Sequence, residues 1–380
     1  MRTIQLDADG MTPRELRADV PALSDAAYFN YGAHGPSPEY VVEAAASFIE
    51  DHEFGSATTD PYEHAFGTYD RVRERIAAFV GAEPEEIALT ESTTDGINRV
   101  AGAIDWEPGD VVVRTDLEHP AGVLPWKRLE REGVEVRVLE TEDGRLDRDE
   151  YAEAVADARL VCFSAITWTH GTRLPVADLV EVANDAGAFT LVDAVQSPGQ
   201  MPMDVNEWGA DAVAAAGHKW TLGPWGAGFL YVDRDVAAGL EPRVVGYRSV
   251  ADPTGDEIEF KPAAGRFEIG TTTAAAHVGL VEALDAVDAV GLDAIESRIE
   301  SLTDRLKDGV PEDRLRSPRE YESGLVTIDV DDPEATVERL GEQDIVVRSL
   351  PHPNGIRASV HAVSTEAEID RLLDALDPEW

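Results

Sequence analysis

A lysine that lies between two apolar segments is the first residue of this sequence whose type and place suit chemistry. Lys219 follows the run A-V-A-A-A-G-H and precedes a glycine-rich turn and a second apolar run, G-F-L-Y-V. Burying a lysine ammonium is costly, and one reason to place the residue here is an imine bond between its amine and an aldehyde. An exposed loop lysine is the ordinary alternative.

Two further groups of polar residues follow expected strands. The segment E-S-T-T-D-G begins an expected helix with Ser92, Thr93 and Thr94, where free N–H groups and the positive dipole end would bind an anion. Ser92 and Asp95 would equally form an ordinary helix N-cap. Asp193 ends the apolar run T-L-V-D, where it is either a functional carboxylate or a capping aspartate.

An alternation of strands and helices must position these residues. The expected strands are 86–90, 110–115, 134–140, 159–166 and 188–194, and the expected helices are 62–80, 121–132, 148–157 and 175–186. This alternation predicts an α/β domain with a largely parallel sheet that is covered on both faces. Ligands of such sheets collect at the carboxyl ends of the strands, where the polar residues lie.

The composition changes at about residues 241–270, which are loop-like and contain several prolines and glycines. We expect an N-terminal arm (1–20), a large domain (21–265) and a small C-terminal α+β domain (266–380). The expected elements of the small domain are helices 274–290, 292–308, 333–341 and 365–376, and strands near 324–330, 345–350 and 356–361. The arm is expected to pack on the small domain.

The chain is strongly acidic, because 75 Asp and Glu residues against 32 Lys and Arg residues give a formal net charge of −43. This charge is spread along the chain and repels nucleic acid and anionic membranes, so neither is expected as a partner. Dense like charge in a lysine-poor globular chain indicates adaptation to high salt, where screening weakens the repulsion.

Several other classes of protein lack support in the sequence. No apolar run reaches the roughly 20 residues of a membrane span, and the first residues do not form a signal peptide, so a cytoplasmic location is expected. The single cysteine, Cys162, excludes an intramolecular disulfide and a cysteine metal cluster. The nine histidines show no ligand spacing, and no metal site is expected.

The candidate residues match what an enzyme that uses pyridoxal 5′-phosphate requires. Such an enzyme needs a Schiff-base lysine, a carboxylate for the pyridine nitrogen, donors for the phosphate, an aromatic ring over the cofactor and an arginine for a substrate carboxylate. Six segments supply them in order: E-S-T-T-D-G-I-N, L-E-H-P-A-G-V-L-P-W, V-D-A-V-Q, A-G-H-K-W, R-F-E-I-G-T and G-I-R-A-S-V-H-A-V-S-T-E. With these segments the chain resembles, over nearly its whole length, the class V aminotransferase family of fold type I pyridoxal phosphate enzymes. That family includes cysteine desulfurases, cystine and cysteine lyases and isopenicillin epimerase-like proteins.

The resemblance implies cofactor roles for the matching residues. The implied cofactor-binding residues are Ser92, Thr93, Thr94, His119, Asp193, Gln196, His218, Lys219 and Thr271. Three of them are implied to be catalytic: Lys219 as the Schiff-base lysine, His119 stacked on the ring, and Asp193 at the pyridine nitrogen. Gln196 would bind the phenolic oxygen, and His218 would lie near the phosphate.

The resemblance also implies how substrate and subunits are arranged. Arg357 would hold the carboxylate of a small amino-acid substrate, and Asn30 and His34 lie in a segment that approaches substrate in relatives. Thr271 would reach the phosphate of a second subunit, which implies a homodimer with shared active sites. His34 is as easily a plain turn histidine.

The sequence departs from the family pattern at positions that bear on cofactor binding and on the type of reaction. Ala216 replaces a hydroxyl residue that would bind phosphate, and the segment V-V-R-S-L-P-H-P-N-G-I-R lacks the mobile cysteine of desulfurases. Cys162, within L-V-C-F-S, is expected in the core. Trp168 and Thr169 replace an asparagine of many desulfurases and are closer to the lyase-like branch.

The sequence therefore predicts a pyridoxal phosphate enzyme that is either an aminotransferase or a cysteine or cystine C–S lyase. A desulfurase-like enzyme, an epimerase-like enzyme and a catalytically silent cofactor-binding regulator are the alternatives. His170, His352 and His361 could line the mouth of the pocket, but structural roles are expected for all three.

Overall fold

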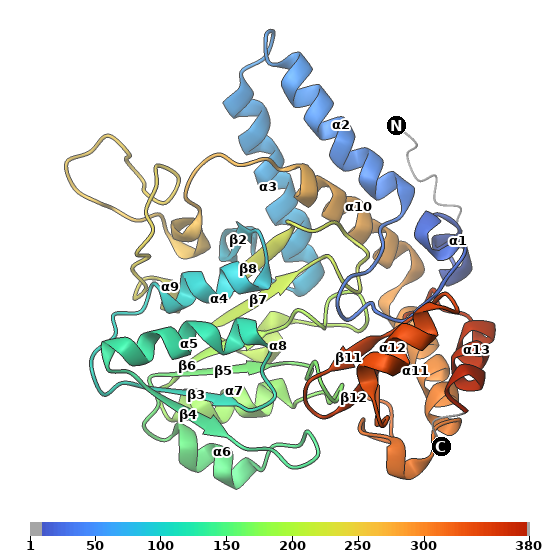
Figure 1. The fold of residues 1–380 in the computed structure, drawn as a ribbon. Coiled ribbons are helices and arrows are strands. Elements are labelled where there is room, and N and C mark those ends of the chain that lie inside the picture. The colour runs from blue at the N-terminus through green and yellow to red at the C-terminus, as the bar shows by residue number, and fades with distance from the viewer. Residues whose placement is uncertain (1–9, 378–380) are drawn as a thin grey trace.

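The computed structural model describes residues 10–377, and at its centre lies a seven-stranded sheet (Figure 1). The strands lie in the order β2-β8-β7-β6-β5-β3-β4. Their bounds are β2 Ile87–Thr90, β3 Val111–Thr115, β4 Glu135–Leu139, β5 Leu160–Ser164, β6 Phe189–Asp193, β7 Ala212–Ala216 and β8 Gly228–Val232. Strand β8 is antiparallel to both of its neighbours, and every other neighbouring pair is parallel. The mostly parallel α/β sheet confirms the predicted fold class.

Helices cover both faces of this sheet, as its continuous apolar strands require. These helices are α4 Thr93–Ala101 and α5 Leu124–Leu129 on one face, and α6 Arg148–Val155 and α7 Val176–Asp185 on the other. In β5, Leu160 and Cys162 pack in the core with α4 and α5, whereas Val161 and Phe163 pack in the core with α6 and α7. The alternation of side chains along a strand thus supplies two separate cores.

The small residues of β7 allow α4 to lie very close to the sheet. Its sequence is A-V-A-A-A, and all five residues are buried. A Cβ placed on Gly96 of α4 would lie 3.1 Å from the Cβ of Ala214, so a larger residue on either side would push the helix away. This contact holds the N-terminus of α4 beside the carboxyl end of β7.

A second, three-stranded antiparallel sheet lies toward the C-terminus, in the order β11-β12-β9. Its strands and the helices around it are β9 Leu325–Ile328, β11 Arg348–Leu350, β12 Gly355–Ser359, α11 Leu292–Asp308, α12 Pro333–Gly341 and α13 Glu366–Leu376. Figure 1 shows this unit, in orange and red, beside one end of the large sheet.

The N-terminal segment packs on this C-terminal unit. Helix α1 (Pro13–Ala18) begins at a capping box, and Arg17 forms an ion pair of 2.7 Å with Glu368 of α13. Strand β1 (Ala27–Tyr28) pairs with β10 (Ile345–Val346) in a separate parallel pair. Residues 1–9 of the predicted arm (1–20) lie outside the described residues.

Three long helices and two short ones complete the described fold. Their bounds are α2 Glu39–Gly55, α3 Pro61–Val80, α8 Val205–Trp208, α9 Arg234–Ala237 and α10 Ala275–Val290. Helices α2 and α3 form a hairpin that extends away from the sheet in Figure 1, and α10 packs against both.

The structure differs from the sequence prediction in a few elements. The expected strand 345–350 is two strands, β10 and β11, which join different sheets. The expected helix 121–132 is α5 with a 3₁₀ turn at each end, Pro120–Gly122 and Glu130–Glu132. Pro120 and Gly133 mark the two ends of the whole segment, and 3₁₀ turns are frequent at the termini of α-helices. The proposed domain boundary near residue 265 stays a prediction.

Among residues 10–377, no helix is long and apolar enough to cross a membrane.

Candidate active site

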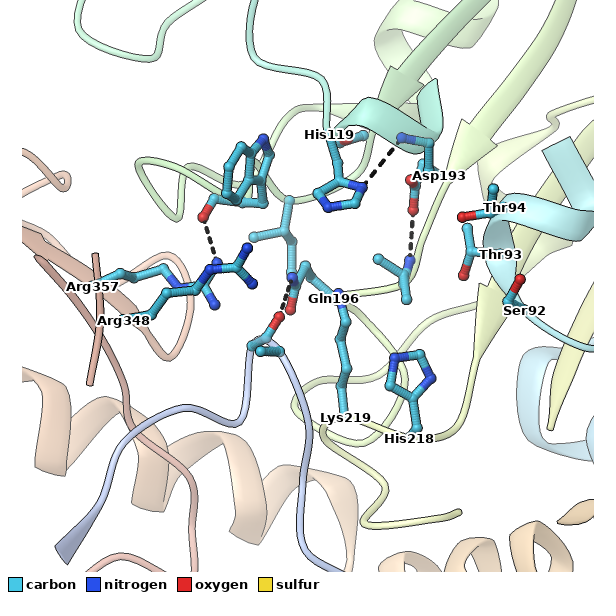
Figure 2. Close-up of a pocket in the computed structure, with 17 residues that line it drawn as sticks. Ser92, Thr93, Thr94, His119, Asp193, Gln196, His218, Lys219, Arg348 and Arg357 are labelled. Carbon is cyan, nitrogen blue, oxygen red and sulfur yellow. Dashed lines mark hydrogen bonds between the residues drawn. The ribbon is translucent and has the colours of Figure 1, made fainter. Parts of the chain in front are cut away.

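A polar pocket lies at the carboxyl ends of the central strands, between the large sheet and the strands β11 and β12 (Figure 2). Its volume is about 170 Å³. The lining residues are Gly32, Ala33, Ser92, Thr93, Thr94, His119, Ala121, Ser164, Ile166, Trp168, Asp193, Val195, Gln196, His218, Lys219, Arg348 and Arg357. Nine of the twelve predicted site residues are in this set, and the fold brings them together from five separate segments.

One end of the pocket is built from the N-terminus of α4. Ser92 is the N-cap, and its Oγ accepts the backbone N–H of Asp95 at 3.1 Å. The Oγ1 of Thr93 is buried and has no hydrogen-bond partner. A buried hydroxyl without a partner is costly, so this atom indicates the place of a bound acceptor. The helix N-terminus favours an anion there.

Lys219 and Asp193 lie near the middle of the pocket. Lys219 follows β7, and Asp193 is the last residue of β6, where its Oδ1 accepts the backbone N–H of Val195 at 3.0 Å. Burial raises the pKa of Asp193 above its ordinary value, against the opposing effect of Lys219. Burial and the two nearby arginines lower the pKa of Lys219 to about 7. A lysine with this pKa is partly a free amine at neutral pH.

His119 lies over the pocket at the end of the loop after β3. Its Nδ1 accepts the backbone N–H of Ala121 at 3.2 Å, and its ring lies edge-on to Trp168 with centroids 5.3 Å apart. Burial, followed by the charges of Lys219 and the arginines, lowers the pKa of His119 to about 4. The ring is therefore neutral at physiological pH and can stack on a flat ligand.

Gln196 connects the pocket to the segment after β1. Its Nε2 donates to the carbonyl of Gly32 at 3.0 Å, and its Oε1 accepts the indole N–H of Trp220 at 2.8 Å. Both ends of the amide are thus oriented by the protein, and one Nε2 hydrogen remains for a ligand. His218, also in the pocket, has its pKa lowered to about 4 by burial.

Two arginines lie side by side at the end of the pocket opposite α4, as Figure 2 shows. Arg357 of β12 and Arg348 of β11 are register partners in the antiparallel pair. Arg357 donates from Nη1 to the carbonyl of Trp168 at 2.8 Å, while its Nε and Nη2 are buried without partners. Burial and the charge of Arg348 lower the pKa of Arg357 to about 9. Unpaired guanidinium groups here favour an anionic ligand.

Arg348 is a pocket residue that the sequence prediction missed. Its guanidinium lies over the ring of Trp168, 5.6 Å from the centroid, and no hydrogen bond joins it to another of the described residues. The available indication was its place in an expected strand just before the turn that leads to Arg357. Two residues directly opposite in a hairpin carry their side chains on the same face.

Three predicted residues do not line this pocket. The Oδ1 of Asn30 is buried without a partner, and the ring of His34 packs against Trp225 at 5.0 Å. Gly32 and Ala33 lie in the pocket in their place. Thr271 lines a second, more open cavity, where its N–H donates to the hydroxyl of Tyr247 at 2.9 Å.

The three histidines for which structural roles were expected, His170, His352 and His361, lie outside the pocket lining. His361 is buried, and its Nε2 lies 2.9 Å from the carbonyl of Trp220. His170 is buried and contacts the hydroxyl of Thr169 at 2.9 Å. Within the described residues, no group of His, Cys, Asp and Glu side chains could hold a metal ion.

The pocket fits an elongated ligand with a phosphate at one end and a carboxylate at the other. The unpartnered Thr93 hydroxyl suits the phosphate, Asp193 suits a protonated ring nitrogen, and Lys219 suits an aldehyde. Pyridoxal 5′-phosphate together with an amino acid has these groups.

The chain is similar in sequence and in structure to proteins of a known family. The profile of the family described as aminotransferase class-V matches residues 27–372. A probable cysteine desulfurase from Methanothermobacter thermautotrophicus is 33% identical in an alignment 391 residues long, which covers 97% of this chain and 98% of that protein. The apo structure of the cysteine desulfurase from Thermococcus onnurineus matches with a TM-score of 0.89 and 29% identity, over 97% of this chain and 98% of that one.

A lyase is also among the similar structures. The cystine C-S lyase C-DES, in complex with its reaction product cysteine persulfide, matches with a TM-score of 0.87 and 28% identity, over 94% of this chain and 98% of that one. A mutant of C-DES has glycine covalently linked to its pyridoxal phosphate cofactor.

Proposed function

Because the chain belongs to the class V aminotransferase family of pyridoxal phosphate enzymes, we propose that its reaction is cleavage of the Cβ–S bond of cystine. One observation carries the choice of a lyase over a desulfurase. The only cysteine in the sequence, Cys162, lies inside β5 with 0% exposure. Burial raises its pKa well above the ordinary value, so it supplies no thiolate to accept sulfur.

The cofactor, when bound, supplies the electron sink that makes the Cα proton of an amino acid acidic. Lys219 is the base that can remove this proton, because a pKa of about 7 leaves roughly half of the amine free at pH 7. Asp193 would hold the proton of the ring nitrogen. The neutral ring of His119 would cover the cofactor and limit the access of water.

The two arginines favour cystine over cysteine as the substrate. Arg357 would bind the α-carboxylate next to the reacting carbon. Arg348, 5.6 Å from the Trp168 centroid and without a carboxylate partner among the described residues, would bind a second carboxylate. Cystine has two carboxylates at its two ends, whereas cysteine has one.

The proposed reaction is balanced with water as the only co-reactant. The proton leaves Cα, the Cβ–S bond breaks, and the sulfur leaves with the bonding electron pair. One cystine and one water then give pyruvate, ammonia and cysteine persulfide. No thiol of the protein takes part.

The experiment is to incubate the holoenzyme with L-cystine or L-cysteine and to quantify pyruvate, ammonia and alanine. Equal amounts of pyruvate and ammonia from cystine, unchanged in Cys162→Ala, are expected. Alanine formation that is lost in Cys162→Ala would instead establish a desulfurase. Alanine formation that requires a 2-oxo acid acceptor would establish an aminotransferase, and the absence of turnover would favour a regulator.

We also propose that the enzyme is a homodimer with shared active sites. In support, Thr271 lines a second cavity and not the pocket that Thr93 lines, and Trp225, which also lines the second cavity, is 67% exposed. A large exposed aromatic side chain is typical of an interface. Light scattering in molar KCl is expected to give twice the chain mass of 41.2 kDa, and a monomer mass would refute the proposal.

A further inference from the structure

A second buried carboxyl group lies in the pocket wall beside Asp193, and the mechanism above does not use it. Glu118 precedes His119 in the loop after β3 and is almost completely buried. Its carboxyl contacts Ser164, a pocket residue at the end of β5. Ser164 is the register partner of Asp193 in the parallel pair of β5 and β6. Two buried carboxyl groups therefore lie on either side of one hydroxyl residue.

The hydrogen bonds around Glu118 are sufficient to place its proton. Its Oε1 accepts the Thr115 hydroxyl at 2.6 Å and the Ser164 N–H at 3.2 Å. The Thr115 hydroxyl thus donates its single hydrogen to Glu118, while its oxygen accepts the N–H of Leu117 at 3.2 Å. The other carboxyl oxygen of Glu118, Oε2, lies 2.6 Å from the Ser164 hydroxyl oxygen. A proton on Glu118 therefore lies on Oε2, between Glu118 and Ser164.

The direction of the Ser164 hydroxyl depends on this proton. When Glu118 is ionised, Ser164 donates to Oε2. When Glu118 is protonated, Oε2–H donates to Ser164, and the serine hydrogen must turn to another acceptor. The pocket is the open side of Ser164.

We propose that Glu118 and Ser164 form a proton-dependent switch, in which protonated Glu118 directs the Ser164 hydroxyl to the cofactor and ionised Glu118 withdraws it. Glu118 acts through Ser164 and is a positioning residue. The proposal uses only the binding of pyridoxal phosphate in this pocket, so it can be tested whichever reaction the enzyme catalyses.

The surroundings of Glu118 bring its titration into the physiological range. Burial raises the pKa of Glu118 to about 7, the three donated hydrogen bonds oppose the rise, and Asp193 adds to it. The titratable groups that face Glu118 are Asp193 on β6 and Cys162 on β5, with His119 next in its own loop. The turn 120–122 that packs over its Oε2 has no titratable side chain.

The variant Glu118→Gln imitates the protonated state, because an amide NH₂ in the place of Oε2 donates to Ser164 at every pH. The dissociation constant of pyridoxal phosphate is measured on apoprotein at pH 6 and pH 8.5. We expect wild type and Glu118→Gln to agree at pH 6, and wild type to bind about five-fold more weakly at pH 8.5, the factor of one net hydrogen bond. The proposal would be overturned if the ratio of the two dissociation constants, wild type to Glu118→Gln, were the same at both pH values. Tighter binding by wild type than by Glu118→Gln at pH 8.5 would also overturn it.

The variant Ser164→Ala tests the same switch from its other member. It is expected to bind about five-fold more weakly than wild type at pH 6 and equally at pH 8.5. The same loss at both pH values would show that the serine hydroxyl does not respond to Glu118, which would overturn the switch. Ser164→Ala also tests the switch if Glu118→Gln does not fold.

Infrared difference spectra of the apoprotein report the proton directly. A protonated-carboxyl band that is present at pH 6, lost by pH 8.5 and missing in Glu118→Gln is expected, and its presence in Glu118→Gln would contradict the assignment. Asp211→Asn is the matched control, because Asp211 accepts the N–H of Thr190 at 2.7 Å and its hydroxyl at 3.1 Å. Thr190 lies near the opposite end of β6 from Asp193, so this variant is expected to bind the cofactor as wild type does at both pH values.

Discussion

The fold disfavours the charged form of Lys219, and this leaves part of the amine free to act as a base. Its pKa is lowered from an ordinary 10.5 to about 7, chiefly by burial. Between these pH values the unfolded chain binds more protons than the folded chain, so the contribution of Lys219 to stability increases as the pH rises from 7 to 10.5. In the apoprotein at neutral pH, this lysine is therefore destabilising.

We predict that apo Lys219→Met is more stable than apo wild type at pH 7 by about 1–3 kcal/mol, because a buried ammonium is replaced by an apolar chain. The gain should disappear as the pH approaches 10.5. Urea denaturation at pH 7, 8.5 and 10 measures it, with Lys127→Met as the exposed control. Equal or lower stability of Lys219→Met at pH 7 would contradict the prediction.

Arg348 gives a prediction about substrate choice. Arg348→Ala should raise KM for cystine by about ten-fold or more, because a charge-assisted hydrogen bond usually contributes that factor to binding. The same variant should raise KM for cysteine much less. Arg357→Ala should raise KM for both substrates. Steady-state kinetics on the two substrates measures the split, and Arg348→Lys should recover part of the affinity for cystine. Equal effects of Arg348→Ala on both substrates would argue against a distal carboxylate site.

At the residue scale, the sequence predicted the groups with distinctive neighbours and missed those whose role depends on the fold. Lys219 and Asp193 end apolar runs, which marks them in the sequence, and the structure places both in one pocket. Arg348 and Glu118 are ordinary strand and loop residues until β11 pairs with β12 and β5 lies beside β3. The partner of Glu118, Ser164, is 46 residues away, so no local pattern reveals it, and the role of Arg348 depends on the hairpin that places it opposite Arg357.

The start of helix α4 separates two hydroxyl groups with different tasks. The Ser92 hydroxyl is used within the helix, because it accepts the N–H of Asp95. The Thr93 hydroxyl is buried and has no partner. The sequence left open whether this segment is a helix cap or an anion site. The structure is compatible with both, because Ser92 caps the helix and the neighbouring Thr93 hydroxyl is free for a ligand.

We predict opposite effects for these two hydroxyls. Ser92→Ala should lower the free energy of unfolding of the apoprotein by about 1 kcal/mol, because the N-cap bond is lost. Thr93→Val should leave that value nearly unchanged and weaken pyridoxal phosphate binding by about five-fold, because its hydroxyl has no bond to lose until the ligand binds. Denaturation curves and cofactor titrations of both variants test this. A large loss of stability in Thr93→Val would show that its hydroxyl has a structural role.

Periodicity identified the elements better than it identified their pairing. The runs that became β3, β5 and β6 are continuously apolar because both faces of a parallel sheet are covered, and this pattern is visible in sequence. The antiparallel direction of β8 and the division of residues 345–350 between two sheets are not visible, because strand partners are set by tertiary packing.

At the scale of the whole molecule, the pocket exists only because two sheets and the N-terminal segment meet. Gly32 lies where a Cβ would be 2.6 Å from Cδ2 of Leu325 and 2.8 Å from Nη2 of Arg357, so a larger residue would displace these buried side chains. Segments near the two ends of the chain are thus brought to the central strands. The motifs indicated which residues belong together, while the separation of the arginines from the α4 anion site depends on the assembled fold.

The net charge of −43 gives a prediction for the whole chain. Repulsion among exposed carboxylates opposes the folded state, and raising the salt concentration from 0.1 M to 1 M shortens the screening length from about 10 Å to about 3 Å. The melting temperature should therefore rise steeply with KCl. A melting temperature that does not respond to molar KCl would refute adaptation to high salt.

Helix α7 offers a variant that separates charge repulsion from other effects of salt. Glu181 and Asp185 are exposed there, and neither takes part in an ion pair among the described residues. Asp185 also lies at the C-terminal end of the helix, where a negative charge is unfavourable. The double variant Glu181→Gln and Asp185→Asn should melt a few degrees higher than wild type in dilute buffer. The two proteins should converge in molar KCl, because screening removes the repulsion that the substitutions remove. A gain that is the same at every salt concentration would mean that helix propensity, and not net charge, is responsible.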